Sequence, residues 1–228
     1  MNRDLELLES LIGYYFKDRS LLIQALTHPS YSGEAGQQRY MSNQRLEFLG
    51  DAVLELAVSD YLYREHPTDE EGELTRKRSS LVFETALNIC ARNIRLGEFI
   101  LLGVGETQNH GYEKPSILSD AFEALIGAIY IDGGYDSAVR FIDCFVVKSI
   151  DELALLHDSK SLMQKYVQQT PGNTMSYDTT EVHEGGHVSG FRSILYINGE
   201  AVSDGLGQSK KQAEQSAAAN ACRKLGIS

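Results

Sequence analysis

Two pairs of acidic residues stand within stretches that are otherwise apolar, and they are the residues best suited to chemistry in this sequence. Glu47 and Asp51 are four positions apart, so in a helix their carboxylates lie about 40° apart on one face. Asp120 and Glu123 are three positions apart in a second apolar stretch and also share a face. We expect the two pairs to converge on one site.

Four carboxylates that converge need an opposite charge nearby. Two unit charges about 4 Å apart repel by roughly 4 kcal/mol at an effective dielectric constant of 20, whereas a whole domain is stable by only about 5 to 15 kcal/mol. Oxygen ligands select hard divalent cations such as Mg²⁺ or Mn²⁺. The alternative is that each acid lies on a solvated helix face or pairs with an arginine, for which Arg45 is the nearest candidate.

Metal ions held by carboxylates suit phosphoryl transfer. One ion lowers the pKa of a water that attacks phosphorus, and a second stabilises the departing 3′ oxygen. Neither step needs a nucleophilic side chain, so serine and histidine residues are not required for this chemistry.

The sequence around the acids predicts a helical domain. Ser42 or Asn43 can cap a helix that begins at Gln44, and Gly133 with Gly134 can end the helix that carries the second acidic pair. We therefore expect an all-α domain of six or more helices. Apolar residues recur at helical spacing in residues 5–12, 21–26, 46–63, 74–96, 117–130 and 138–156.

Charge and composition change near residue 158. Residues 1–158 hold 14 Lys and Arg against 26 Asp and Glu, whereas residues 159–228 hold 7 against 6. The net charge of -11 is therefore carried by the first segment. We expect a helical domain over 1–152, a short linker over 153–158 without a Gly/Ser-rich tether, and a second domain over 159–228.

The second segment predicts a small α+β domain of order α-β-β-β-α. Asn198 and Gly199 predict a tight hairpin turn, and Ser209 with Gln212 forms a possible capping box at the last helix. The predicted elements are a helix over 161–169, strands over 175–183, 188–198 and 200–204, and a helix after Ser209.

Polar residues of this second segment could contact duplex RNA. Lys210 and Lys211 fall in the first turn of the last helix, where free N–H groups and the helix dipole attract phosphate. Gln164 and Gln168 are one turn apart and could bond 2′-hydroxyl groups in the minor groove of RNA. His187 lies in the predicted loop between the first two strands. Each feature alone is common on solvated surfaces, but together they favour RNA binding.

The whole-chain composition limits the class of protein. Of 228 residues, 42% are apolar and 23% are charged, as in ordinary globular proteins. The chain has no apolar run of about 18 residues, and Asp4 and Glu6 stand where a signal peptide needs an apolar core. Three separated cysteines, Cys90, Cys144 and Cys222, form neither a zinc motif nor a disulfide framework. We expect a cytoplasmic protein without a membrane partner.

Over essentially its full length, the chain resembles bacterial ribonuclease III. Residues 45–54 (RLEFLGDAVL), with Asn43 just ahead, resemble the signature of that family, and residues 120–124 (DAFEA) resemble its second acidic motif. Residues 25–31 (ALTHPSY) and 71–74 (EGEL) match shorter motifs of the family. Residues 205–218 are the strongest match to a double-stranded-RNA-binding domain.

The resemblance implies roles for individual residues. Glu47, Asp51, Asp120 and Glu123 match metal ligands of the family, with Asp51 and Glu123 its most critical catalytic pair and Mg²⁺ the cofactor, which Mn²⁺ can replace. Glu71 matches an accessory acid of the cleavage valley. The positions that match RNA contacts are Gln164, His187, Lys210 and Lys211.

The resemblance also implies an activity. The family forms a homodimer through its helical domain and cuts both strands of double-stranded RNA, which leaves 5′-phosphate and 3′-hydroxyl ends with two-nucleotide 3′ overhangs. Its substrates include precursors of ribosomal RNA and other structured transcripts.

Two positions depart from the family pattern, and two other functions compete. Gln44 stands where many relatives carry glutamate, and Glu184-Gly185 replaces a common Gly-Pro in the RNA-contact loop. A duplex-RNA-binding protein without catalysis would explain Gln44 but not the four acids. A helical phosphohydrolase of small nucleotides would explain the acids but not the second segment.

Overall fold

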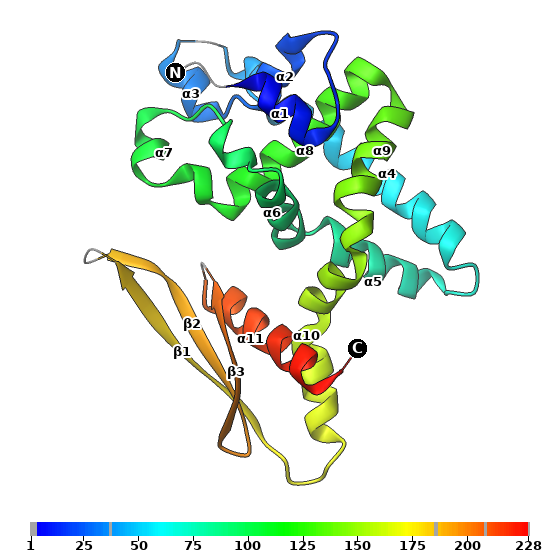
Figure 1. Cartoon of the computed structure of the whole chain (residues 1–228), viewed down its shortest axis with the longest axis vertical. Helices are drawn as coiled ribbons and strands as arrows, with labels where there is room; N and C mark the ends of the chain where they lie inside the picture. The colour runs from blue at the N-terminus through cyan, green and yellow to red at the C-terminus, as the bar shows by residue number, and fades with distance from the viewer. Residues whose placement is uncertain (1–3, 37, 185–186, 208, 228) are drawn as a thin grey trace. The chain divides into compact units, whose positions relative to one another are not determined.

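The computed structural model describes residues 4–36, 38–184, 187–207 and 209–227. The chain divides into two compact units, residues 1–150 and 151–228, whose elements are labelled in Figure 1. Each unit is described by itself below. Among the described residues, we find no helix with both the length and the apolar character needed to cross a bilayer.

The first unit is helical, which confirms the predicted fold class of this segment. Short 3₁₀ turns connect several of the helices. The helices are α1 (Leu5–Ile12), α2 (Arg19–Ala25), α3 (Pro29–Glu34), α4 (Gln44–Glu65), α5 (Glu71–Val82), α6 (Glu84–Asn93), α7 (Val104–Gln108), α8 (Pro115–Gly133) and α9 (Tyr135–Phe145).

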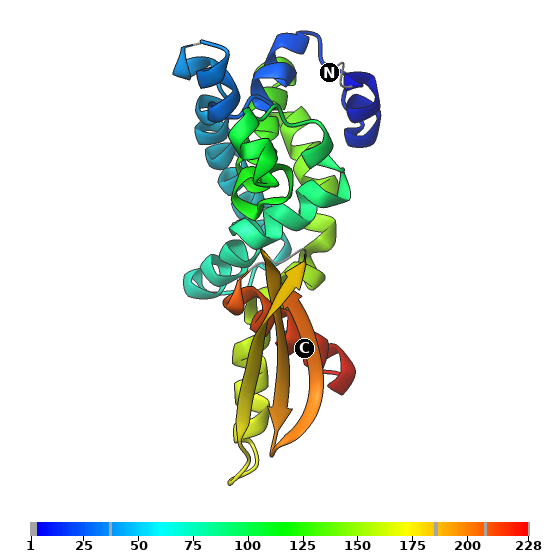
Figure 2. The same ribbon diagram turned by 90° about the vertical axis from the view of Figure 1, so that its left-hand side faces the viewer.

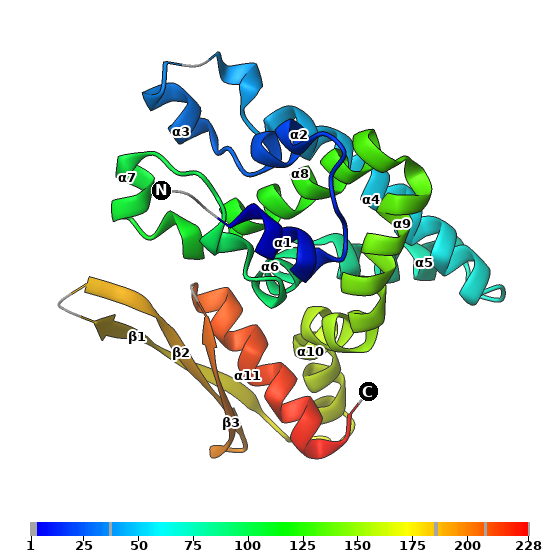
Figure 3. The same cartoon turned by 45° about the horizontal axis from the view of Figure 1, so that its top comes forward.

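Helix α8 supplies much of the core of this unit. It packs against α4, α6 and α9, and it lies among them in Figure 3. Phe122, Leu125, Ile126 and Ile129 of α8 are completely buried, and burial of each such side chain stabilises the fold by about 1.5 to 3 kcal/mol. The helix that carries Asp120 and Glu123 is therefore held firmly in place.

Two of the predicted helical stretches are interrupted in the structure. The stretch 74–96 is broken at Phe83, which has an extended conformation with ψ of 155° between α5 and α6. The stretch 138–156 is broken by a 3₁₀ turn, Val147–Ser149. The helical spacing of apolar residues continues across such breaks because it indicates only which residues face the core. Leu81 and Leu87, on either side of Phe83, are both buried.

Polar contacts attach the N-terminal segment to the end of α8. Asp132 accepts hydrogen bonds from the Tyr14 hydroxyl at 2.6 Å and from the backbone N–H groups of Lys17 at 3.0 Å and Asp18 at 2.9 Å. Burial and the bond to this carboxylate raise the pKa of Tyr14. The hydroxyl therefore remains a hydrogen-bond donor at neutral pH.

The second unit has the predicted order α-β-β-β-α. Its sheet is antiparallel with strand order β1-β2-β3, and the three strands run side by side in Figure 2. Helix α10 includes residues 153–158, for which we expected a linker, and it is longer than the predicted helix over 161–169. The domain limits 1–152 and 159–228 remain a prediction. The elements are α10 (Ile150–Gln168), β1 (Met175–Glu184), β2 (His187–Ile197), β3 (Glu200–Gly207) and α11 (Lys210–Leu225).

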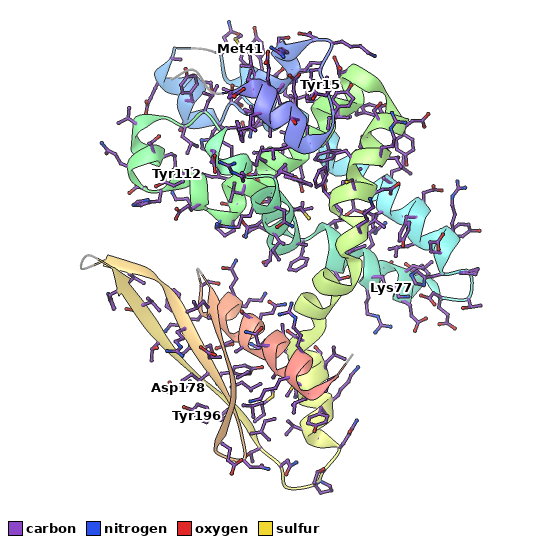
Figure 4. The ribbon with its side chains drawn as sticks, viewed as in Figure 1. Tyr15, Met41, Lys77, Tyr112, Asp178 and Tyr196 are labelled. Carbon is purple, nitrogen blue, oxygen red and sulfur yellow. The ribbon has the colours of Figure 1, made fainter. Side chains whose placement is uncertain are left out.

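The two helices of this unit pack on one face of its sheet. Met163 of α10, Leu195 of β2 and Ala218 of α11 belong to one buried cluster. Asp178 and Tyr196 project from the opposite face of the sheet, as Figure 4 shows. The alanine-rich side of α11 is therefore part of the core of this unit.

Candidate active site

Helices α4 and α8 cross with their backbones in direct contact. A Cβ atom added to Gly50 of α4 would lie 1.8 Å from the carbonyl oxygen of Glu123, and one added to Gly127 of α8 would lie 2.2 Å from that of Leu46. Real Cβ atoms essentially never approach closer than 3.0 Å. The crossing therefore requires glycine on both helices, and it places the acid-bearing turns of α4 and α8 against each other.

The structure brings together the four predicted acids at this crossing. Burial, and then the charges of Asp51, Asp120 and Glu47 in that order, together raise the pKa of Glu123 to about 8. The pKa of Glu47 is also raised, by burial first and then by Asp120 and Asp51. Such mutual effects require carboxylates that lie near one another. The catalytic and metal-binding roles of these residues remain a prediction.

A fifth acid joins this group, and we did not predict it from the sequence. Burial raises the pKa of Asp120, and the next largest cause is the charge of Glu84. Glu84 is exposed and begins α6. No second acid stands beside it at helical spacing, so only the packing of α6 on α8 relates it to the other carboxylates.

The donor set fits a hard divalent cation in its chemistry. The four acids offer only carboxylate oxygens, which suit Mg²⁺ and Mn²⁺. In the part of the chain that the structure describes, none of the four forms an ion pair, and Arg45 forms none with them. The raised pKa of Glu123 is the expected property of carboxylates that no positive charge neutralises.

The side chains of the four acids do not form a closed set of metal ligands. Among the described residues, no three His, Cys, Asp or Glu side chains are gathered around a common point as metal ligands are. Glu47 and Glu123 are half-buried, whereas Asp51 is exposed, so the group opens to solvent on the Asp51 side.

One other predicted position, Glu71, lies apart from the four acids. Glu71 is exposed at the start of α5 and accepts a hydrogen bond from the Thr75 hydroxyl at 3.3 Å. It is not among the charges that raise the pKa of Glu47, Asp120 or Glu123. The structure does not bring Glu71 into the cluster.

Helix α4 begins close to the acids, but its start differs from our expectation. Asn43 occupies the N-cap position, yet its side chain makes no capping hydrogen bond within the described residues. Its backbone N–H instead donates to the carbonyl of Thr27 at 2.8 Å. Gln44 follows as the first, exposed residue of α4.

In the second unit, four of the predicted RNA contacts are exposed. Gln164 and Gln168 lie one turn apart on α10, and Lys210 and Lys211 begin α11. The ammonium group of Lys210 lies 6.0 Å from the centre of the Phe191 ring on β2. This cation–π contact was not predicted from the sequence.

The third predicted RNA-contact region is only partly described. His187 is the first residue of β2 rather than a loop residue, because the first two strands pair up to Glu184 and His187. The side chain of His187 and the residues Gly185 and Gly186 lie outside the described part of the chain.

Glycine residues also set the position of α11 against the sheet. A Cβ atom added to Gly205 would lie 2.2 Å from the backbone nitrogen of Ala217, and one added to Gly207 would lie 2.4 Å from that of Ala213. Ser209 caps the helix by accepting a hydrogen bond from the N–H of Gln212 at 3.2 Å. These contacts hold the lysine-bearing turn of α11 close to β3.

Comparisons with known proteins agree with this two-part organisation. A family model described as Ribonuclease-III-like matches residues 18–150, and one described as a double-stranded RNA binding motif matches residues 159–225. The proteins named Ribonuclease 3 from Oceanobacillus iheyensis and Bacillus cereus are each 43% identical to the chain. Each match covers 96% of this chain. It covers 96% of the Oceanobacillus iheyensis protein and 91% of the Bacillus cereus protein.

Solved structures of ribonuclease III nuclease domains are also similar to the helical unit. A nuclease domain of ribonuclease III from Campylobacter jejuni is 44% identical, with a TM-score of 0.58, and the match covers 66% of this chain and 96% of that domain. A second structure of that domain is 46% identical, with a TM-score of 0.57, and the match covers 62% of this chain and 98% of that domain. The fold and the acids define a nuclease joined to an RNA-binding domain. The chain belongs to the ribonuclease III family and is an endoribonuclease.

Proposed function

We propose that the chain is a Mg²⁺-dependent endoribonuclease that cuts both strands of double-stranded RNA. Asp51 and Glu123 form the catalytic pair, and Glu47 and Asp120 complete the metal ligands. The observation that carries this proposal is the group of four carboxylates from α4 and α8, in which burial and then the charges of the other three acids raise the pKa of Glu123 to about 8. Mn²⁺ can replace Mg²⁺, because both prefer oxygen ligands.

The residues of the chain prepare this site for a cation. Bound Mg²⁺ would supply activation of water and stabilisation of the departing 3′ oxygen. Glu123 holds a proton on its carboxyl group near neutral pH and must release it before it can act as a ligand. Asp51 is exposed, so its carboxylate faces the side from which a large substrate can approach. We propose that the products carry 5′-phosphate and 3′-hydroxyl ends with two-nucleotide 3′ overhangs.

We propose that α4 also forms the interface of a homodimer. Phe48, Leu56 and Tyr63 are 80%, 58% and 73% exposed, and their spacing places them within about 80° of one another around the helix. An exposed apolar stripe of this kind favours association. One structure of the ribonuclease III nuclease domain from Campylobacter jejuni is described as flexible in a region involved in dimer formation. Glu47 and Asp51 border the stripe, so a dimer would place two sites along one interface.

The dimer can be tested by sedimentation equilibrium of the full chain. Phe48→Arg should halve the molecular mass, because a buried unpaired charge at the interface is unfavourable. Tyr15→Arg is a matched control, since Tyr15 is 67% exposed but does not belong to α4. A dimeric Phe48→Arg variant would contradict the proposed interface.

We propose that the second domain binds the RNA duplex. Gln164 and Gln168 would contact 2′-hydroxyl groups, Lys210 and Lys211 would contact phosphates, and His187 would reach a neighbouring groove. The proposed domain limits are 1–152 and 159–228. We propose precursors of ribosomal RNA and other structured transcripts as substrates, and the cytoplasm as the compartment, which suits three free cysteines.

A cleavage assay tests the central proposal. The purified full chain should cut a long RNA duplex in the presence of Mg²⁺ and leave single-stranded RNA intact. Glu123→Gln should abolish cleavage while binding of the duplex remains close to that of the unchanged protein. Glu113→Gln, which alters an exposed acid outside the cluster, should retain activity. If Glu123→Gln cuts at the normal rate, the assignment of the metal site is wrong.

The same assay separates the competing functions. A protein that binds the duplex but never cuts it with Mg²⁺ or Mn²⁺ would be a non-catalytic RNA-binding protein. A protein that hydrolyses small nucleotides but not duplex RNA would be a phosphohydrolase. Our proposal predicts cleavage of the duplex that weakens as salt rises, because phosphate contacts release counterions.

A further inference from the structure

We propose that Gly127 and Gly50 are positioning residues for the active site, because their contact sets the separation of α4 and α8 and thereby the separation of the two carboxylate pairs. This inference rests on the proposed function of the four acids. It assigns to two buried glycines a role in binding the metal that is distinct from their role in packing.

The contact is reciprocal and is made entirely by backbone atoms. A Cβ atom on Gly50 would lie 1.8 Å from the carbonyl oxygen of Glu123 and 2.9 Å from the backbone nitrogen of Gly127. A Cβ atom on Gly127 would lie 2.2 Å from the carbonyl oxygen of Leu46 and 3.2 Å from the backbone nitrogen of Gly50. Because these atoms belong to helical backbone, they cannot rotate away as a side chain can. An added methyl group must move one helix relative to the other.

Glycine is required at this crossing because there is no room for a Cβ atom, and not because the backbone has an unusual conformation. The φ angle of neither Gly50 nor Gly127 lies in the left-handed region that favours glycine. Both stand inside helices of 22 and 19 residues, where glycine is less favourable than alanine. Their benefit must therefore come from the close approach of the two helices.

The crossing lies within the turns that carry the acids. Gly50 directly precedes Asp51, and the atom that it approaches most closely is the carbonyl oxygen of Glu123 itself. Gly127 approaches Leu46, which directly precedes Glu47. A shift of either helix at this point is thus transmitted to both carboxylate pairs, because each acid lies within three residues of a contacting backbone atom.

The required shift is large compared with the tolerance of a metal site. Ordinary van der Waals contact begins at 3.4 Å, so alanine at position 127 must separate the two backbones by about 1.2 Å. A misplacement of about 1 Å in a reacting group can reduce catalysis by about 10²-fold. Weaker support of metal ligands typically reduces metal affinity by about 10- to 100-fold.

The test compares Gly127→Ala with Gly133→Ala in the full chain. Gly133 lies on the same helix, and its added Cβ would also be crowded, at 2.4 Å from the Tyr14 hydroxyl oxygen and 2.7 Å from that of Ser137. Both variants should lower the melting temperature. Only Gly127→Ala should weaken Mn²⁺ binding by about 10- to 100-fold in calorimetry without RNA and reduce kcat by about 10²-fold. Its affinity for duplex RNA should not change.

A titration with metal distinguishes positioning from damage to the fold. If the separation of the acids is the defect, excess Mn²⁺ should restore part of the activity of Gly127→Ala, because occupancy of a weakened site rises with metal concentration. Gly50→Ala should behave in the same way. Gly133→Ala should show the same dependence on Mn²⁺ as the unchanged protein.

Two outcomes overturn the inference, and a third overturns the proposed function instead. It is wrong if folded Gly127→Ala binds Mn²⁺ and cuts RNA like the unchanged protein. It is also wrong if both crossing variants fail to fold while Gly133→Ala folds, since the glycines would then maintain the fold rather than the site. If the unchanged protein itself neither binds Mn²⁺ nor cuts duplex RNA, the proposed function fails instead.

Discussion

The proton on Glu123 should make the stability of the helical unit depend on pH. Burial, followed by the charges of Asp51, Asp120 and Glu47, raises the pKa of Glu123 from 4.5 to about 8. Above about pH 4.5 the unfolded chain releases this proton, whereas the folded chain keeps it up to about pH 8. The folded state therefore binds more protons in this window, and the free energy of unfolding falls as pH rises. Above about pH 8 this decrease should stop.

The size of the effect follows from the pKa difference, with a correction for solvent. At about 1.4 kcal/mol for each pKa unit, the full difference corresponds to about 5 kcal/mol. Glu123 is only half-buried and Asp51 is exposed, so water screens part of the repulsion. We expect a loss of roughly 1 to 3 kcal/mol between about pH 5 and pH 9.

Glu123→Gln should remove this loss, because glutamine resembles the protonated glutamate in shape and charge. Without divalent metal, the variant and the unchanged protein should be equally stable at about pH 5, where Glu123 is protonated. At about pH 9 the variant should be more stable by roughly 1 to 3 kcal/mol. The inactive variant would thus be the more stable protein.

Urea unfolding of the full chain in a chelator, followed by far-ultraviolet circular dichroism, measures this difference. Adding Mg²⁺ at about pH 9 should stabilise the unchanged protein more than Glu123→Gln, because a bound cation neutralises the carboxylates. Glu113→Gln, which alters an exposed acid outside the cluster, is the control variant. An advantage of Glu123→Gln that is equal at both pH values, or absent at high pH, would refute the raised pKa of Glu123.

Three further predictions concern other contacts. Gly205→Ala should lower the free energy of unfolding by about 1 to 3 kcal/mol in thermal denaturation, because its Cβ would meet the backbone of α11. Phe191→Leu should weaken duplex binding about two- to five-fold in fluorescence anisotropy, since a cation–π contact contributes about 0.5 to 1 kcal/mol, whereas Phe191→Tyr should keep it. Asp132→Asn should lower the free energy of unfolding by about 1 to 3 kcal/mol, because it weakens the bonds from Tyr14 and its neighbours.

Structure that depends on neighbouring residues was the most predictable from the sequence. Asn198 and Gly199 adopt positive φ angles of 53° and 81°, as the predicted hairpin turn requires. Ser209 caps α11 through the N–H of Gln212 as expected. In each case the residues that decide the conformation are within a few positions of one another, so the signal is local.

Structure that depends on distant residues was predicted less well. The break at Phe83 carries no Gly or Pro, and the apolar spacing continues through it because α5 and α6 face the same core. Ser42 or Asn43 was expected to cap α4, but among the described residues the Asn43 side chain makes no capping bond, and its backbone N–H donates to Thr27 instead. Glu84 joins the acids only through the packing of α6 on α8. None of these contacts has a counterpart in the adjacent sequence.

The convergence of the acids could be predicted from the sequence only in part, because it depends on both nearby and distant residues. The spacing of each pair predicts a shared face on one helix, but a shared site also requires two helices to meet at one level. Gly50 and Gly127 provide that second condition; Gly50 lies between Glu47 and Asp51, and Gly127 lies one turn after Glu123. Glycine within one turn of an acid on an apolar helix is therefore a signal of close crossing that the spacing of the acids alone does not contain.

Two unfavourable features coincide at the crossing of α4 and α8. Carboxylates without a counter-charge destabilise the folded state, and glycine inside a helix costs about 0.5 to 1 kcal/mol relative to alanine. Neither feature is needed to fold a helical unit whose core already contains the buried side chains of α8. A place where several local sequence preferences for folding are violated together is typical of a functional site. The buried core of α8 offsets this instability, and a divalent cation would remove the larger part of it.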